Sequence, residues 1–305
     1  MGAKMRKLIR KGKVKEVFEV GKDRLSFFFT DNISLFDKIV PNDIPRKGET
    51  LCKTSKYWFD RVEEELGIKT HFIEMVEDNR IIVKKVDVIS DYDKIDESTD
   101  NYIIPLQFIS RYFVAGSLYD RIIDGEIDYT DLGFKEQPEY GERLSEPFFE
   151  VVTKFEESER NLSEEKALKI SGLTIDEFKE IKGSILKIDK LIKNNVEKNG
   201  LLHVDGKKEF AMDEKRNIML IDTFGTADED LYWEKEEYMK GNFVQKSKEF
   251  VRQYYREIGY HRDISEARKN YEEEPSIPPL TEDMVQKTSE LYVEMMKKLT
   301  DGKYI

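Results

Sequence analysis

Acidic and basic side chains stand at every second position of the segment 205–209, ahead of a polar DEKRN sequence and an apolar IMLID sequence. This pattern predicts a β-hairpin within residues 202–233. Because strand side chains alternate between two faces, Asp205, Lys207 and Glu209 are expected together on one face, opposite an apolar one. Such a face has the charges needed to bind phosphates and metal ions.

The register of this hairpin decides which carboxylates meet. If residues 214–217 form its loop, Glu209 lies directly across from Asp222. Facing carboxylates repel each other. A divalent cation that shares its oxygen ligands with the phosphates of a nucleotide would compensate, so Glu209 and Asp222 are candidate metal ligands. A slipped register, with both carboxylates in solvent, is the alternative.

Two other short motifs contain residues suited to anionic ligands. Gly12 lies in a turn between two predicted strands, where its backbone can approach phosphates that Lys13 and Lys15 would neutralise. Arg111 precedes a small-residue turn that ends at Ser117, and this pair could clamp a phosphate or carboxylate. Surface lysines and an ordinary strand end are the simpler interpretations of these two motifs.

The segment 30–51, TDNISLFDKIVPNDIPRKGETL, contains more Asp, Asn, Pro and Gly than a simple connection requires. Long structured loops are often functional. Asp31, Ser34 and Asp37 are therefore candidate ligand-binding residues. They could equally form Asx-type turns that hold the loop itself.

The elements that must position these residues divide the chain into two predicted lobes. Residues 7–115 are mainly short β-rich segments, interrupted by a helix over about 50–66 that ends at Gly67. We expect the division near residue 115, with a β-rich lobe at 1–115 and an α/β lobe at 116–305 that contains the hairpin. The predicted fold class is α+β with two lobes.

Helices are prominent in the second half of the chain. Thr174 and Glu177 have the spacing of a capping box that opens a helix. The apolar residues of this helix recur at helical spacing and are expected in the core: Phe178, Ile181, Ile185, Ile188, Ile192 and Val196. Two further helices are predicted over about 244–258 and 281–299, joined through a Pro-rich extended connection.

Composition narrows the classes of protein and partner. The chain has 305 residues, 37% of them charged, and a net charge of −12, which disfavours a broad nucleic-acid-binding surface. Cys52 is the single cysteine, so neither an intramolecular disulfide nor a cysteine metal site is expected. No segment has the roughly 20 apolar residues that span a membrane, and no signal-peptide pattern occurs. We expect a cytoplasmic protein without membrane partners, and a homo-oligomer remains open.

Together and in this order, the motifs resemble those of the SAICAR synthetase family (phosphoribosylaminoimidazole-succinocarboxamide synthase). The resemblance covers nearly the whole chain. The matching segments are GKVKEVFEV, TDNISLFDKIVPNDIPRKGETL, RYFVAGS, EPFFEVVTK, the hairpin with DGKKEF and LID, KEFVRQYY, and QKTSELYVEMMKKLTDGK.

The resemblance implies an ATP-dependent ligase of purine biosynthesis, in which the lobe at 1–115 binds the nucleotide and an ATP cleft lies between the two lobes. ATP would activate the carboxylate of a phosphoribosyl aminoimidazole carboxylate (carboxyaminoimidazole ribotide) as an acyl phosphate, and L-aspartate would displace phosphate. It implies roles for the following residues: ATP contacts at Lys13, Lys15, Lys85, Gln107, Glu209 and Asp222; Mg²⁺ at Glu209 and Asp222; catalysis by Lys207 and Asp205; and substrate contacts at Asp31, Ser34, Asp37, Arg111, Ser117, Lys207 and Arg252.

The chain departs from the family pattern beside the hairpin. Thr223 follows Asp222 where the family has a glutamate, and TADEDL (226–231) replaces a segment that contains an arginine expected to contact an anionic substrate group. A glutamate is also common at the position of Gln107. Two alternatives therefore accompany the ligase prediction: a paralogous ATP-dependent amide ligase with another acceptor, and a nucleotide-binding module that has lost catalysis.

Overall fold

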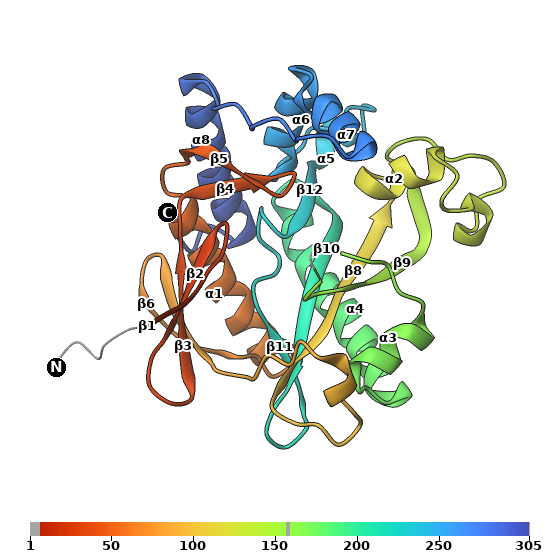
Figure 1. Ribbon diagram of the computed structural model, residues 1–305. Coiled ribbons are helices and arrows are strands. Elements are labelled where there is room, and N and C mark those ends of the chain that lie inside the picture. The colour runs from red at the N-terminus through yellow and green to blue at the C-terminus, as the bar shows by residue number, and fades with distance from the viewer. Residues whose placement is uncertain (1–6, 157–158, 305) are drawn as a thin grey trace.

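The computed structural model describes residues 7–156 and 159–304. Its architecture is α+β, as predicted, and is built around two antiparallel sheets with helices packed against them (Figure 1). The first sheet and α1 lie on the left of Figure 1, while the second sheet and α4 lie on the right.

The first sheet has five strands in the order β1-β2-β3-β7-β6. It lies within the stretch 7–115 that was predicted to consist mainly of short β-rich segments. A separate two-stranded sheet, β4-β5, follows β3. The bounds are β1 Lys7–Lys11, β2 Lys15–Glu19, β3 Arg24–Phe29, β4 Asn32–Leu35, β5 Lys38–Asp43, β6 Phe72–Glu77 and β7 Arg80–Lys84.

The second sheet is built on β10, which pairs with β8, β11 and β12, while β9 pairs with the other edge of β8. Thus β8, which precedes residue 115, joins strands from the second half of the chain. The division into lobes at that residue stays a prediction. The bounds are β8 Tyr102–Phe113, β9 Arg143–Thr153, β10 Leu201–Met212, β11 Ile218–Ile221 and β12 Asp230–Glu234.

The helices confirm the main sequence signals. α1 (Lys47–Leu66) ends at Gly67, whose φ of 63° is left-handed, and α4 (Ile175–Lys198) begins at the predicted capping box. α6 begins several residues later than expected, and α7 was not predicted. The remaining helices are α2 Gly116–Ile123, α3 Glu164–Ser171, α5 Lys235–Tyr238, α6 Glu249–Glu257, α7 Tyr260–Asn270 and α8 Glu282–Leu299, with 3-10 turns at Tyr92–Lys94 and Tyr129–Leu132.

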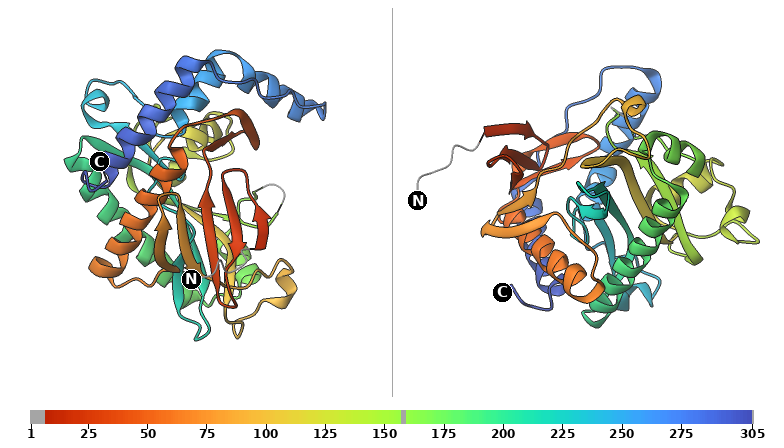
Figure 2. Two further views of the ribbon diagram at one scale, coloured as in Figure 1. Left: turned by 90° about the vertical axis from the view of Figure 1, so that its left-hand side faces the viewer. Right: turned by 90° about the horizontal axis from the view of Figure 1, so that it is seen from below.

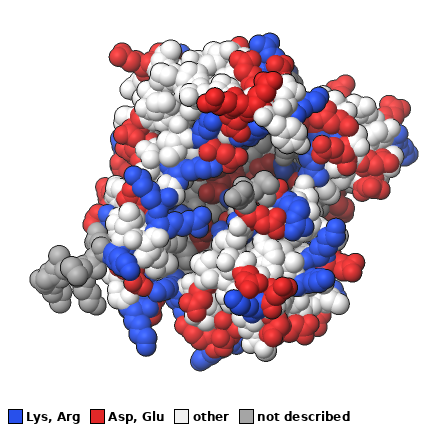
Figure 3. All heavy atoms as spheres, in the orientation of Figure 1, with Lys and Arg blue, Asp and Glu red and all other residues white. Residues whose placement is uncertain are grey.

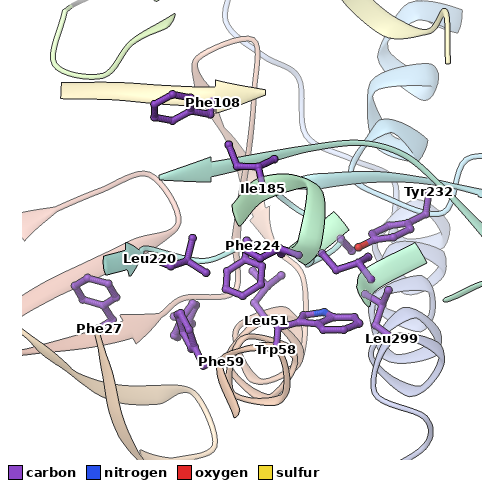
Figure 4. Close-up of a cluster of buried hydrophobic side chains, with 14 of the residues drawn as sticks. Phe27, Leu51, Trp58, Phe59, Phe108, Ile185, Leu220, Phe224, Tyr232 and Leu299 are labelled. Carbon is purple, nitrogen blue, oxygen red and sulfur yellow. The ribbon is translucent and has the colours of Figure 1, made fainter. Parts of the chain in front are cut away.

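The largest core cluster joins the two sheets through α1, α4 and α8. All six predicted apolar residues of α4 are buried in it. Phe59 of α1 and Phe224, which follows β11, meet edge to face at 5.5 Å between ring centroids (Figure 4). This packing holds the end of the hairpin against α1. No helix among the described residues is long and apolar enough to cross a bilayer. Figure 2 shows α8 passing beside α1.

Candidate active site

The register of the hairpin differs by one residue from the prediction. Glu209 pairs with Ile221, and Asp222 lies one residue beyond the end of β11. The cause is the turn, because the amide of Asp213 donates to the carbonyl of Asn217 at 3.0 Å and brings Asn217 into the ladder. The loop is therefore Glu214–Arg216, and Arg216 takes a left-handed φ of 58°, as is common in three-residue hairpin loops.

Glu209 and Asp222 nevertheless approach each other through a shared cation. Lys154, which follows β9, forms an ion pair with Glu209, and its Nζ lies 3.9 Å from Oδ2 of Asp222. Asp222 has a left-handed φ of 57° and forms a second ion pair with Lys15 of β2. Burial raises the pKa of Asp222, but Lys15, Lys154 and Lys207 outweigh burial and hold this pKa far below its usual value.

This cluster joins the two sheets, since Lys15 comes from the first and Glu209 from the second. Lys15 also lies over the ring of Phe27, 4.5 Å from its centroid. On the face of the molecule that is seen in Figure 1, Figure 3 shows acidic and basic side chains around a hollow near the centre. A set of lysines and carboxylates that bridges two sheets can bind phosphates and a divalent cation together.

The other predicted ATP contacts are placed differently. Gln107 of β8 pairs directly with Glu209, is only 7% exposed, and its Oε1 has no hydrogen-bond partner among the described residues. Lys85 pairs with Glu19 at 2.6 Å on the first sheet. The structure thus brings Gln107 next to the carboxylate cluster, whereas the ammonium of Lys85 is held by another partner.

The loop predicted to bind a ligand forms the β4-β5 hairpin and the start of α1. Asp31 accepts a hydrogen bond from the amide of Gly48 at 2.8 Å, so its carboxylate fixes the first turn of α1. Ser34 lies in β4 opposite Ile39. Asp37 is exposed in the hairpin turn and forms an ion pair with Lys13 at 2.8 Å. This ion pair connects two of the predicted ligand-binding segments.

Arg111 and Ser117, the two residues of the predicted anion clamp, lie in direct contact. Arg111 of β8 donates to Oγ of Ser117 at 3.0 Å, and its guanidinium lies 3.1 Å from Oδ2 of Asp205. Arg111 also forms an ion pair with Glu150 of β9, which Arg121 contacts as well. Burial raises the pKa of Asp205, and Arg111 opposes this rise.

Lys207 has a carboxylate partner that the sequence did not suggest. Its Nζ lies 3.0 Å from Glu229 and 3.7 Å from Glu209. Burial lowers the pKa of Lys207, but Glu229, Glu209 and Asp222 outweigh burial and raise it, so the ammonium stays charged. Lys207 thus links Glu209 of β10 to Glu229, which lies at the end of the loop before β12.

The loop Thr223–Glu229 connects β11 to β12 and is firmly anchored. Its Gly225 carbonyl accepts hydrogen bonds from Trp58 Nε1 at 2.9 Å and from the hydroxyl of Tyr232 at 3.0 Å. Asp228 forms an ion pair with the fully buried Lys47 at 2.7 Å and accepts a hydrogen bond from Tyr292. One of the unexpected acidic residues of the TADEDL segment therefore points into the protein.

The predicted substrate contact Arg252 lies on α6. Its guanidinium donates to Glu249 at 3.0 Å, and 39% of its side chain is exposed. Lys248 precedes it at the start of the helix. Burial lowers the pKa of Lys248, although Asp228 opposes this effect. The described residues place no ion-pair partner within 4 Å of the Lys248 ammonium, so a cation remains available next to Arg252.

A second group of potential metal ligands lies behind the site. One ligand atom each of Asp189, His203 and Asp230 lie within 4.8 Å of one another, and all three residues are buried. The ammonium of Lys208 lies 2.5 Å from Asp189 and 3.2 Å from Asp230. Lys208 therefore already supplies the positive charge that these carboxylates need.

Sequence reasoning missed Lys154 and Glu229. Lys154 stands in the EPFFEVVTK segment that carries the family resemblance, and this could have marked it as a site residue. Glu229 gave no signal, because it stands in the TADEDL segment that departs from the family pattern. Glu229 reaches its partner Lys207 only because β12 pairs with β10, which brings the two segments together.

Comparison with known proteins identifies the family. A profile of the family described as SAICAR synthetase matches residues 8–267. A protein of Thermoplasma volcanium named phosphoribosylaminoimidazole-succinocarboxamide synthase is 50% identical over 298 residues, which cover 98% of this chain and 100% of the relative. The chain belongs to the SAICAR synthetase family.

Other members of the SAICAR synthetase family agree in sequence and fold. The relative of the same name from Thermoplasma acidophilum is also 50% identical over 298 residues, with the same shares of both chains covered. A solved SAICAR synthetase (Type-2) in complex with ADP has a TM-score of 0.64 and 28% identity, covering 80% of this chain and 89% of that chain. SAICAR synthase of Saccharomyces cerevisiae, complexed with SAICAR, shares the fold with a TM-score of 0.73 at 24% identity, covering 98% and 96%.

Proposed function

We propose that this chain is an ATP-dependent ligase that joins L-aspartate to the carboxylate of carboxyaminoimidazole ribotide in purine biosynthesis. The 50% identity to two relatives named phosphoribosylaminoimidazole-succinocarboxamide synthase, over essentially their whole length, carries this proposal. The cluster of lysines and carboxylates that bridges the two sheets supports it, because both halves of the reaction concern anionic substrates.

The reaction requires two group transfers. A carboxylate oxygen of the ribotide attacks the γ-phosphorus of ATP, which forms an acyl phosphate and releases ADP. The amine of aspartate then attacks the acyl carbon, an amide bond forms, phosphate leaves with the former carboxylate oxygen, and the amine loses a proton. Phosphoryl transfer of this kind depends on positioning and charge neutralisation more than on a protein nucleophile.

The nucleotide half of the proposed site comprises Lys13, Lys15, Lys85 and Gln107 together with the two carboxylates. Lys15 is the best supported of these phosphate ligands, since it already holds an anionic oxygen of Asp222. Gln107 offers an unpartnered buried oxygen beside Glu209. The Gln107 oxygen could accept a hydrogen bond from an amino group. Lys85 would have to leave Glu19 to reach a phosphate.

Glu209 and Asp222 are the proposed ligands of Mg²⁺. The donor set fits, because both are carboxylates whose oxygens converge on the single ammonium of Lys154, and hard oxygen ligands suit this ion. When bound, Mg²⁺ would neutralise phosphate charge. Lys154 and Lys15 would then hold the same carboxylates in place and contribute their own charge to the phosphates.

The acceptor half of the proposed site contains Arg111, Ser117, Lys207 and Arg252, with the Asp31–Asp37 loop beside it. Arg111 and Ser117 are in contact, and Lys207 lies between the metal-type carboxylates and Glu229. Each offers a donor to a phosphate or carboxylate. Asp205 is the proposed acceptor of the amine proton, because burial raises its pKa above that of an ordinary aspartate.

We propose different roles for the two lobes. Residues 1–115 would supply most nucleotide contacts, and 116–305 would supply the metal and substrate residues. A homo-oligomer is compatible with this arrangement, and we place the enzyme in the cytoplasm with the other steps of small-molecule biosynthesis.

The function is tested by measuring ADP release from purified protein with ATP, Mg²⁺, the ribotide and aspartate, omitting one component at a time. We expect release that requires all four. Release that persists without aspartate but needs the ribotide would mean that water takes the acyl group, and it would contradict the role of aspartate. No release above the ribotide-free background would contradict the proposal.

A further inference from the structure

Lys208 is fully buried on the face of β10 opposite Lys207. Its ammonium lies 2.5 Å from Oδ1 of Asp189 in α4 and 3.2 Å from Oδ2 of Asp230 at the start of β12. Burial lowers the pKa of Lys208, but these two carboxylates outweigh burial and raise it. This is an ion cluster that water does not reach, because all three side chains are at most 1% exposed.

The surrounding donors complete the cluster. Ser110 donates to Oδ2 of Asp189 at 2.5 Å, and Tyr112 donates to the same oxygen at 2.7 Å. On the other side, His203 Nε2 lies 2.7 Å from Oδ2 of Asp230. Two carboxylates around one ammonium are stable in a protein interior when further hydrogen bonds support them. Oδ2 of each carboxylate has such partners here, while Oδ1 of Asp189 is held by the Lys208 ammonium alone among the described residues.

A glycine in β10 makes room for the cluster. A Cβ atom at Gly206 would lie 2.3 Å from Oδ2 of Asp230 and 2.4 Å from the ammonium of Lys208. Glycine in a strand interior weakens the strand, and it often marks a close approach of another group. The approach here is made by Asp230, the residue at the end of the segment that departs most from the family pattern.

Asp230 fixes the loop that leads into it. Its Oδ1 accepts the amide of Gly225 at 3.0 Å, which closes the loop onto the start of β12. The amide of Asp230 donates to the carbonyl of Thr226 at 3.0 Å, so a tight turn precedes β12. Glu229, the last residue of this turn, lies 3.0 Å from Lys207.

Two ion pairs therefore involve neighbouring residues of β10 and neighbouring residues at the end of the loop. The inner pair is Lys208–Asp230, and the outer pair is Lys207–Glu229. Each member of the inner pair is the chain neighbour of a member of the outer one. A shift of Asp230 would therefore displace Glu229 and the charge around Lys207.

We propose that Lys208 is a positioning residue, which through Asp230 fixes the loop Thr223–Glu229 and sets the geometry of the Lys207–Glu229 pair in the acceptor half of the site. The assignment of this half to the ribotide rests on the proposed function. Lys208 itself touches no substrate. Its effect should therefore appear in the use of the ribotide and leave nucleotide binding nearly unchanged.

The test compares Asp230→Asn, Lys208→Met and the double variant with wild type. Asp230→Asn keeps the shape and leaves Lys208 paired with Asp189, so it should fold. We expect the KM for the ribotide to rise about three- to tenfold, with ADP–Mg²⁺ affinity within about twofold of wild type. Lys208→Met leaves two buried carboxylates without their cation and should have the larger effect, which the added Asp230→Asn should partly reverse.

Arg216→Met is the matched control. It breaks the ion pair of Arg216 with Glu177, 2.9 Å long, at the far end of the same hairpin. It should lower the melting temperature without changing the ribotide KM. If Asp230→Asn and Lys208→Met also lowered only the melting temperature, or raised the KM values for ribotide and ATP equally, Lys208 would have a purely structural role and the proposal would be wrong.

Amide hydrogen exchange of residues 222–231 tests the positioning role without depending on ligase activity. We expect faster exchange in this segment for Asp230→Asn and Lys208→Met than for Arg216→Met. This result would support the positioning role even if wild-type protein showed no ligase activity, in which case the proposed function alone would fail. Unchanged exchange in both variants would overturn the positioning role.

Discussion

Glu209 and Asp222 are not cross-strand partners, yet both carboxylates approach the same ammonium, that of Lys154. The expected repulsion between them is thus compensated within the protein. Lys15 adds a second positive charge on the side of Asp222. Two carboxylates, Glu209 and Asp222, are thus matched by two ammonium groups, those of Lys154 and Lys15.

Glu209→Gln and Asp222→Asn should each weaken Mg²⁺-dependent ADP binding by at least about tenfold, because each removes a hard anionic ligand. The variants should stay folded, since amides of the same shape remain. Isothermal titration with ADP and Mg²⁺ checks the first expectation and circular dichroism the second. Glu237→Gln, which removes a half-buried carboxylate paired with the exposed Lys240, is the matched control. Undiminished binding in both site variants would refute the metal assignment.

Lys154→Met should make the fold depend on a divalent cation. Without this ammonium, Glu209 and Asp222 lose the cation that they share, and only Lys15 and the more distant Lys207 remain as positive neighbours. We expect a lower melting temperature in EDTA and a larger rise on adding MgCl₂ than in wild type, by linkage of ion binding to folding. Thermal scans in the two buffers measure this difference. An equal response of both proteins to MgCl₂ would show that Lys154 does not substitute for the ion.

Lys207→Met should raise the KM for the ribotide by at least about tenfold and change ADP affinity by less than about twofold. The reason is that Lys207 lies nearest to Glu229, in the loop before β12, whereas Lys15 pairs with Asp222. Steady-state kinetics and ADP titration separate the two effects, with the exposed Lys240→Met as the control. A selective loss of ADP affinity would mean that the two halves of the site are reversed.

The Lys47–Asp228 pair should contribute to stability in a pH-dependent way. Burial raises the pKa of Asp228, but Lys47 and Lys248 outweigh burial and lower it from 3.8 to about 2. A carboxyl with a lower pKa in the folded state stabilises the fold above its unfolded pKa, and this contribution is lost as the pH falls from about 4 to about 2. We expect the loss between about pH 5 and about pH 3 to be about 1 kcal/mol.

Urea unfolding of wild type and Asp228→Asn at these two pH values isolates this term from other carboxyl groups. Wild type should lose more unfolding free energy than the variant on acidification. The variant should be less stable at the higher pH, since its buried Lys47 lacks a counter-charge. Parallel losses in the two proteins would exclude Asp228 as the titrating group.

Much of the fold follows from local sequence signals. The capping box at Thr174, the glycine after Leu66 and the apolar spacing in α4 each determine a structure over a few residues, and each was predicted correctly. The hairpin was also predicted, but its register was wrong by one residue. The length of the loop depended on Asn217 joining the ladder, and a single residue of this kind shifts every pair.

The candidate site was less predictable because its contacts join distant segments. Arg111 and Ser117 are close in sequence, and their contact followed from the motif. Lys154 reaches Glu209 only because β8 lies between β9 and β10 in the second sheet. The sequence did not indicate what the acidic TADEDL segment faces, and its Asp230 is buried with Lys208.

The central claim is that ATP activates the ribotide carboxylate for attack by aspartate. The most direct measurement uses ribotide labelled with ¹⁸O in the carboxylate, incubated with the protein, ATP, Mg²⁺ and aspartate, and mass spectrometry of the products. The account predicts an amide of ribotide and aspartate that retains one labelled oxygen, and inorganic phosphate that carries the other. Absence of the amide, or an amide formed with unlabelled phosphate, would contradict it.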